Sequence, residues 1–128
     1  MIETQSPRLA VVSLRAEDLP TTVQFYQDVI GLHILPHHQP HPAFELENDV
    51  FLVILQGHPN PKPVSKEERF PAIAFVVDDL ESVIEHLKSH DVALPWGIEE
   101  RAGDRWVKFY DPAGNLIEIA QFSKLHEI

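Results

Sequence analysis

The chain contains no cysteine, a single methionine, and half as many basic residues as acidic ones. Without cysteine it can form no disulfide, no thiolate metal site and no cysteine nucleophile. Its 20 acidic and 10 basic residues give a formal net charge of −10. Such a charge opposes binding to nucleic acid and to anionic membrane surfaces, and it favours cationic small molecules or metal ions. Solubility is the simpler interpretation of the acidity, and we set nucleic-acid binding aside.

Long apolar runs are also missing. No run reaches the roughly 18 apolar residues that a membrane-spanning helix needs, so we expect no membrane partner. The opening stretch MIETQSPRLAVVSL lacks the positive region and small-residue cleavage site of a signal peptide, so we expect a cytoplasmic protein. The chain has 128 residues, of which 44% are hydrophobic. This length and composition predict one globular domain with a substantial core.

Two segments of the chain follow one pattern, RLAVVSLRAEDLPTTVQFYQDVIGL and PAIAFVVDDLESVIEHLKSHDVAL. Each begins with an apolar run, continues with an Asp-Leu pair, and then places apolar residues at helical spacing. Asp18 and Asp79 stand where a helix N-cap is expected, with Asp78 as the alternative to Asp79. Asp18 and Asp79 lie 61 residues apart, and the apolar positions that follow them keep the same offset. Such a constant offset predicts two copies of one structural module.

Strand-like segments follow each expected helix. They lie at 33–37, 43–47 and 50–55 in the first half, and at 93–96, 106–110 and 116–122 in the second. The sequence therefore predicts an α+β fold with the order β-α-β-β-β repeated twice. The proline-rich segment GHPNPKPVSKEERFP separates the halves, so we divide the single domain 1–128 into module 1 (8–58), a linker (59–70) and module 2 (71–122).

The segments DLPTTVQFYQDVIGL and FYDPAGNLIEIAQF together resemble the vicinal oxygen chelate superfamily, also called the glyoxalase, bleomycin-resistance and dioxygenase superfamily. The resemblance implies two βαβββ modules that form a curled mixed sheet around a concave cavity, usually in a homodimer. Members of this superfamily include lyases, isomerases, dioxygenases, thiol transferases and drug-binding proteins without catalytic activity. The fold therefore does not select the function.

The resemblance also implies where a metal would be held, at positions on the first and last strand of each module. In this chain these positions fall on Val11, about Val53, Ala72 and Glu118. Glu118 alone carries a group that can coordinate a metal, and one carboxylate holds a divalent ion too weakly. We therefore expect no metal site of the usual kind and no resident cofactor.

A histidine-rich stretch, HILPHHQPHP, supplies the alternative. If this loop folds over the cavity, His37 and His41 could join Glu118 in a set of two histidines and one carboxylate that binds one divalent metal ion. The simpler interpretation is a solvated, proline-rich loop that happens to carry histidines.

Candidate ligand-binding residues come from strand alternation and from the aromatic side chains. Arg15 is expected on the cavity face, where its guanidinium could bind a carboxylate or phosphate of a ligand, or could pair with Glu118. Phe44, Trp96 and Trp106 are expected to line the cavity and to stack on planar or cationic ligands. Each of these aromatic residues could instead complete the core or a dimer interface.

Two hypotheses on function follow. The first is a small-molecule-binding protein that lacks the usual metal ligands and resembles the drug-binding branch of the superfamily. The second is an enzyme, either a lyase or isomerase or a dioxygenase, in which Glu118 acts with an unusual metal site or as a base. A regulatory module without a small ligand is a third possibility.

Overall fold

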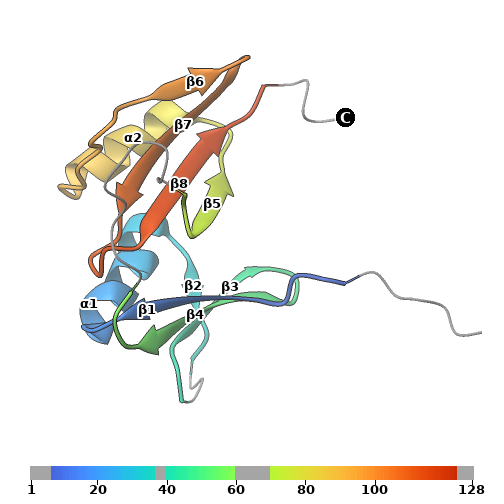
Figure 1. Ribbon diagram of the computed structural model, residues 1–128, viewed down its shortest axis with the longest axis vertical. Coiled ribbons are helices and arrows are strands. Elements are labelled where there is room, and N and C mark those ends of the chain that lie inside the picture. The colour runs from blue at the N-terminus through green and yellow to red at the C-terminus, as the bar shows by residue number, and fades with distance from the viewer. Residues whose placement is uncertain (1–6, 37–39, 60–69, 124–128) are drawn as a thin grey trace, which may run out of the picture.

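The protein is described by a computed structural model, which covers residues 7–36, 40–59 and 70–123 in the detail used below. Figure 1 shows two modules, each with a helix beside a sheet. The elements of the first module are β1 (Val11–Ala16), α1 (Leu19–Gln24), the π-helical segment η1 (Phe25–Ile30), β2 (His33–Ile34), β3 (Ala43–Glu47) and β4 (Val50–Gln56). Those of the second are β5 (Ile73–Val76), α2 (Leu80–Ser89), β6 (Glu99–Arg101), β7 (Asp104–Tyr110) and β8 (Leu116–Gln121).

Each module forms one mixed, four-stranded sheet with the same strand order. The orders are β1-β4-β3-β2 and β5-β8-β7-β6. In both sheets the first and last strands of the module pair in parallel, and the remaining neighbours pair antiparallel. The helix between the first two strands supplies the crossover that such a parallel pair requires. The predicted α+β fold with two βαβββ modules is confirmed.

One predicted strand, at 93–96, is wrong. These residues lie outside the sheet, and the Gly97 amide closes a turn by donating to the Leu94 carbonyl at 3.1 Å. Pro95 has no amide hydrogen to donate to a strand ladder, which favours the turn. The strand that pairs with β7 is instead β6, whose sequence EER carries no apolar alternation. A second difference is β2, which ends at Ile34, although the prediction extended to His37, a residue outside the described ranges.

The two helices begin at the predicted caps. The Asp18 carboxylate accepts a hydrogen bond from the Thr21 amide, and the Asp79 carboxylate accepts one from the Ser82 amide, both at 3.2 Å. The first helix changes at Phe25 into the wider η1 turn, which ends at Gly31 with a φ of +85°. Glycine adopts this left-handed conformation without steric cost. Within the described residues, no helix is long and apolar enough to cross a membrane.

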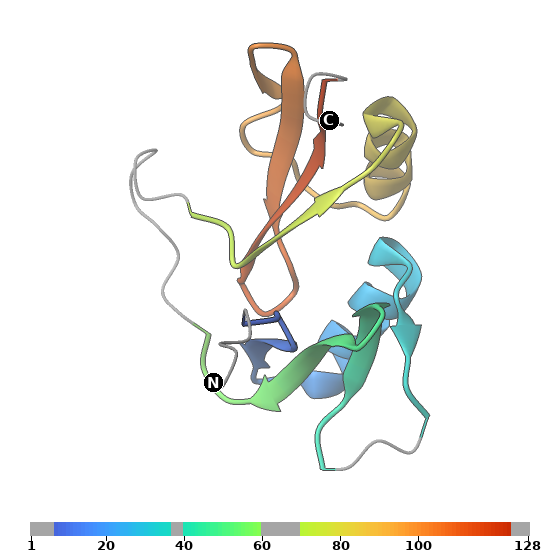
Figure 2. The same cartoon turned by 90° about the vertical axis from the view of Figure 1, so that its right-hand side faces the viewer.

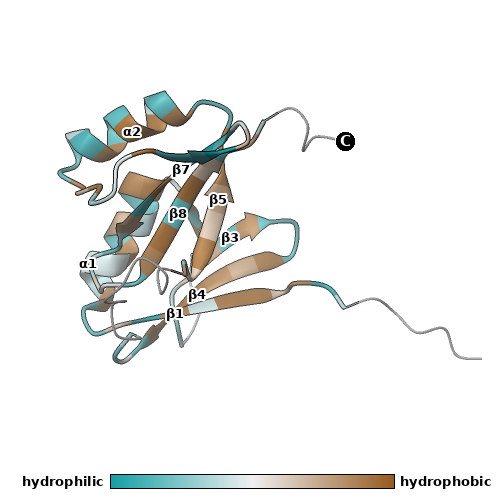
Figure 3. Ribbon diagram, turned by 45° about the horizontal axis from the view of Figure 1, so that its top comes forward, coloured by the Kyte–Doolittle hydropathy of each residue, from teal (hydrophilic) through white to brown (hydrophobic). Residues whose placement is uncertain are grey.

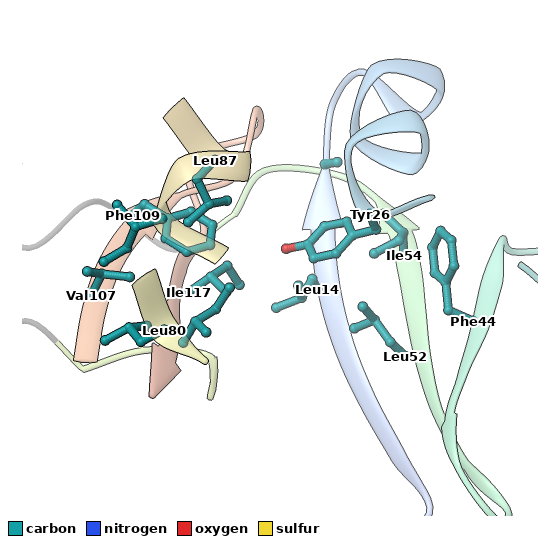
Figure 4. Packing of buried hydrophobic residues seen from close by; sticks show 13 residues of the cluster. Leu14, Tyr26, Phe44, Leu52, Ile54, Leu80, Leu87, Val107, Phe109 and Ile117 are labelled. Carbon is teal, nitrogen blue, oxygen red and sulfur yellow. The ribbon is translucent and has the colours of Figure 1, made fainter. Parts of the chain in front are cut away.

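The core lies between each sheet and its own helix. In the first module Leu14, Leu52 and Ile54 pack under Tyr26, and Figure 4 shows this group beside a matching group in the second module. The matching group consists of Leu80 and Leu87 from α2 with Val107, Phe109 and Ile117 from the second sheet. Figure 3 shows β5 and β8 as largely hydrophobic, whereas α2 also carries polar residues. The opposite face of each sheet is not covered by the helix of its own module.

The turn between β7 and β8 joins the two modules, and Figure 2 shows it beside the first module. Its Asp111 side chain, which is 4% exposed, accepts a hydrogen bond of 2.6 Å from the Tyr26 hydroxyl. The other carboxylate oxygen accepts from the backbone amides of Ala113, Gly114 and Asn115, at 3.0, 2.9 and 2.8 Å. The Asn115 amide group then donates to the Arg15 carbonyl at 3.0 Å. We call this set of contacts the module joint.

The module joint predicts that the fold loses stability when the Tyr26 hydroxyl group is removed. Tyr26→Phe should lower the free energy of unfolding by about 1–3 kcal/mol, because the buried Asp111 carboxylate loses a donor that the phenylalanine ring cannot replace. Urea unfolding followed by circular dichroism measures the change. The control is Asp78→Asn at an exposed position, which should change stability by less than about 0.5 kcal/mol. Equal stability of Tyr26→Phe and the parent chain would show that the joint contributes little.

Candidate ligand-binding face

The face of the second sheet that points away from α2 carries a group of polar and aromatic side chains. Strand register places Glu118 beside Ala74 of β5 and Lys108 of β7. Because side chains alternate along each strand, Trp106 shares this face, and Glu99 of β6 pairs with Trp106. We call this surface the Glu118 face. It comprises Ala74, Val76, Glu99, Trp106, Lys108, Tyr110, Leu116, Glu118 and Ala120.

Glu118 is a half-buried carboxylate in the middle of this face. Its direct neighbours along β8 on the same face, Leu116 and Ala120, are both buried. Burial raises the pKa of Glu118 above its ordinary value, the positive charge of Lys108 acts in the opposite direction, and the negative charge of Glu99 adds to the rise. Glu118 can therefore exchange a proton closer to neutral pH than an exposed glutamate does.

Trp106 lies at one end of the Glu118 face. Its register partner on β8 is the buried Ala120. The indole Nε1 is itself buried, and no described residue accepts its hydrogen bond. A buried donor without an acceptor costs free energy, and the packing of the indole ring has to offset this cost.

Trp96 reaches the other end of the face from the turn that precedes β6. Its ring lies 5.9 Å from the ring of Tyr110, measured between centroids, at an interplanar angle of 60°. Such a tilted pair is a favourable aromatic arrangement. The chain contains two tryptophans in all, and the structure brings both of them to this surface.

Phe44 lies elsewhere, contrary to the expectation that it lines the cavity. It pairs with Leu52 on the helix-facing side of the first sheet and is 0% exposed. Its ring packs 6.1 Å from that of Tyr26. Alternation along AFELE puts Phe44 and Leu46 on one side and Glu45 and Glu47 on the other, so the pattern itself favours a core position for Phe44. Phe44 is a core residue in this structure.

Arg15 is exposed on the face of the first sheet away from α1, with Ser13 beside it. These two residues line a pocket of about 380 Å³ at the module joint, together with Leu55, Pro59, Ala72 and Asn115. Arg15 forms no ion pair with Glu118, whose charged neighbours are Lys108 and Glu99. The joint fixes the Arg15 backbone through Asn115, so the guanidinium extends from a held position.

The residues at the metal-binding positions of the superfamily do not fit a metal ion. Val53 pairs with Ser13 in the first sheet as Glu118 pairs with Ala74 in the second, so the two residues are structural equivalents. An isopropyl group cannot coordinate a metal. Among the residues described, no three histidine, aspartate or glutamate side chains gather closely enough to hold one. His37 lies outside the described residues, and the proposed set of His37, His41 and Glu118 thus stays a hypothesis.

The Glu118 face also contains three residues outside the predicted candidates, namely Lys108, Glu99 and Tyr110. Lys108 and Tyr110 could have been found, because the alternation in DRWVKFY places Trp106, Lys108 and Tyr110 on one side and Val107 and Phe109 on the other. Glu99 could not, because it lies on a strand without an apolar pattern.

Comparison with known proteins decides the family. A model of the Glyoxalase/Bleomycin resistance protein/Dioxygenase superfamily matches residues 8–119. The chain belongs to this superfamily. No curated protein sequence matches the chain.

Several solved structures share the fold of this chain. The antibiotic binding protein TnmS3 from Streptomyces sp. CB03234 is 21% identical, with a TM-score of 0.76 over 94% of this chain and 100% of that one. Lactoylglutathione lyase from Agrobacterium tumefaciens is 19% identical, with a TM-score of 0.71 over 98% and 100% of the chains. An integron cassette protein from V. Cholerae is 24% identical, with a TM-score of 0.70 over 95% and 100%. At these identities the similarity shows the fold alone.

The raised pKa of Glu118 predicts how stability depends on pH. A carboxyl group whose pKa is higher in the folded chain than in the unfolded chain stabilises the fold below the unfolded pKa, and this contribution is lost as pH rises through the folded pKa. Glu118→Gln should therefore unfold at a higher urea concentration than the parent chain at neutral pH. The difference should disappear as pH falls below the ordinary range of glutamate.

The control for this experiment is Glu85→Gln, at an exposed position on α2. We expect the control to show no comparable gain at neutral pH. If Glu118→Gln were less stable than the parent chain at neutral pH, the ionised carboxylate would be stabilised by its neighbours and the sign assigned here would be reversed.

Proposed function

We propose that this superfamily member binds a small organic molecule on the Glu118 face, without a resident metal ion. The observation that carries the proposal is a half-buried carboxylate set among apolar and aromatic side chains on an open sheet face. A carboxylate at such a place needs a partner to offset its lost hydration. Lys108 supplies part of that compensation, and a ligand group that donates a hydrogen bond or carries positive charge would supply more.

The chemistry of the face indicates a planar ligand. Trp106 and Tyr110 offer aromatic surfaces on either side of Lys108 along β7, and indole and phenol rings stack on planar groups or attract cations. Arg15 lies in the adjoining pocket at the joint, where it would bind a carboxylate or phosphate if the ligand carries one.

The relatives give this proposal a precedent within the fold. TnmS3 is described as an antibiotic binding protein, and its fold is shared with this chain. We further propose that this chain acts as a homodimer, as the superfamily resemblance implies, and that it acts in the cytoplasm. The acidic net charge of −10 supports a ligand that is neutral or cationic overall.

Catalysis is a second candidate function, favoured by the raised pKa of Glu118. A carboxylate with such a pKa can act as a general base on a carbon-bound or oxygen-bound proton of the ligand. Lactoylglutathione lyase from Agrobacterium tumefaciens shares the fold, which shows that the scaffold supports an enzyme. If an activity is found and Glu118→Gln retains it, this second candidate is excluded.

Intrinsic fluorescence tests the binding proposal directly, because Trp96 and Trp106 both report on the Glu118 face. Titration with a panel of planar cationic and neutral antibiotics should give saturable quenching for at least one compound. Glu118→Gln should weaken the binding of a cationic compound about tenfold, since a hydrogen bond to a charged group contributes roughly 1.5–3 kcal/mol.

The matched control for the titration is Glu45→Gln, an exposed glutamate of β3 on the other sheet, which should bind as the parent chain does. Trp96→Phe and Trp106→Phe then assign the quenching to one end of the face. A panel without any saturable quenching, or equal binding by Glu118→Gln, would remove the support for this site.

Native mass spectrometry of untagged protein purified without added metal tests the remaining parts of the proposal. We expect the mass of a dimer without a divalent ion, and any additional mass would lead to the ligand. One divalent ion per subunit would contradict the metal-free proposal, and the loop histidines His37 and His41 would then be the first residues to substitute together with Glu118.

A further inference from the structure

An apolar cleft lies between the two modules and meets the Glu118 face at Ala74 and Val76. It has a volume of about 590 Å³. The first module contributes Leu9, Val12, Leu46 and Val50, and the edge strand β5 contributes the opposite wall. Neither Arg15, Trp106, Lys108 nor Glu118 lines it.

A second cavity of about 430 Å³ adjoins the first and shares Leu32, Phe75 and Val76 with it. It continues between η1 and α2, where Val29, Ile30 and Val83 form its walls. At this end the His86 Nε2 atom donates to the Val29 carbonyl at 3.0 Å, a contact that links the two modules. The shared residues make the two cavities one elongated cleft.

The walls of this cleft expose large apolar side chains to water. Leu9 is 64% exposed and Val76 is 63% exposed, and burying such surface is favourable. The volume of the wider cavity, about 590 Å³, lies within the range of about 300–1,000 Å³ that is typical of small-molecule sites. An apolar occupant of this size would therefore gain free energy by displacing the water.

The charged residues of the lining indicate the kind of occupant. Arg8 and Glu47 both line the wider cavity, and their opposite charges give it no net electrostatic preference for an anion or a cation. We propose that this cleft binds a neutral, elongated, apolar molecule, selected by shape and burial rather than by charge. The cleft shares Ala74 and Val76 with the Glu118 face, but Glu118, Trp106 and Lys108 do not line it.

Nile red, a neutral apolar fluorophore, is the probe for this cleft. Titrated into the full chain, it should give saturable fluorescence with one site per chain. Leu9→Asp should weaken the binding about tenfold or more, because a charge would line an apolar site. Ile98→Asp is the matched control, since Ile98 is also exposed, at 48%, and lies outside both cavities. Glu118→Gln should bind the probe as the parent chain does.

Any one of several results would overturn the proposal. They are a parent chain without saturable fluorescence, an equal loss in Leu9→Asp and Ile98→Asp, and a probe that binds only when dimers dissociate. Sedimentation of the parent chain with and without Nile red detects the last, which would make the cleft a contact between copies of the chain. Loss of probe binding in Glu118→Gln would instead place the probe on the Glu118 face and contradict a separate site.

Discussion

The arrangement of the whole molecule depends on how one buried carboxylate is satisfied. Asp111 accepts three backbone amides of its own turn on one oxygen, and the Tyr26 hydroxyl and the Asn115 side chain on the other. Burial beside this carboxylate raises the pKa of Tyr26 far above its ordinary value, so the phenol stays a donor. The same contacts shape the turn and attach it to the first module. One set of contacts therefore fixes both the local geometry of the turn and the relative placement of the two sheets.

The sequence predicts the parts of the fold that repeat. The N-cap aspartates, the helical spacing after them and the final strands of both modules are all local patterns, and the structure confirms them. One strand was missed and one predicted strand was wrong, for different reasons. The strand β6 has the polar sequence EER and is held by its pairing with β7, whereas Pro95 interrupts the apolar stretch that resembled a strand.

The sequence predicts the residues at the centre of the candidate site and misses those at its edges. Glu118 stood out as a carboxylate within an apolar strand, and Trp106 as an aromatic residue on a neighbouring one. The position of Phe44 could have been derived, since alternation along β3 sets Phe44 on the side opposite Glu45 and Glu47. The function of the turn as a joint was hidden, because Tyr26 lies 85 residues away from Asp111 in the sequence.

The module joint also breaks the symmetry of the repeat. The turn from Asp111 to Asn115 in the second module corresponds to the short Asn48-Asp49 turn between β3 and β4 in the first. The shorter turn has no proline, no glycine and no buried aspartate. Two copies of either module, linked head to tail, would therefore lack one half of the joint. The chain is a duplicated architecture whose halves are not interchangeable, because the turn at 111–115 and its partners Tyr26 and Arg15 lie in different modules.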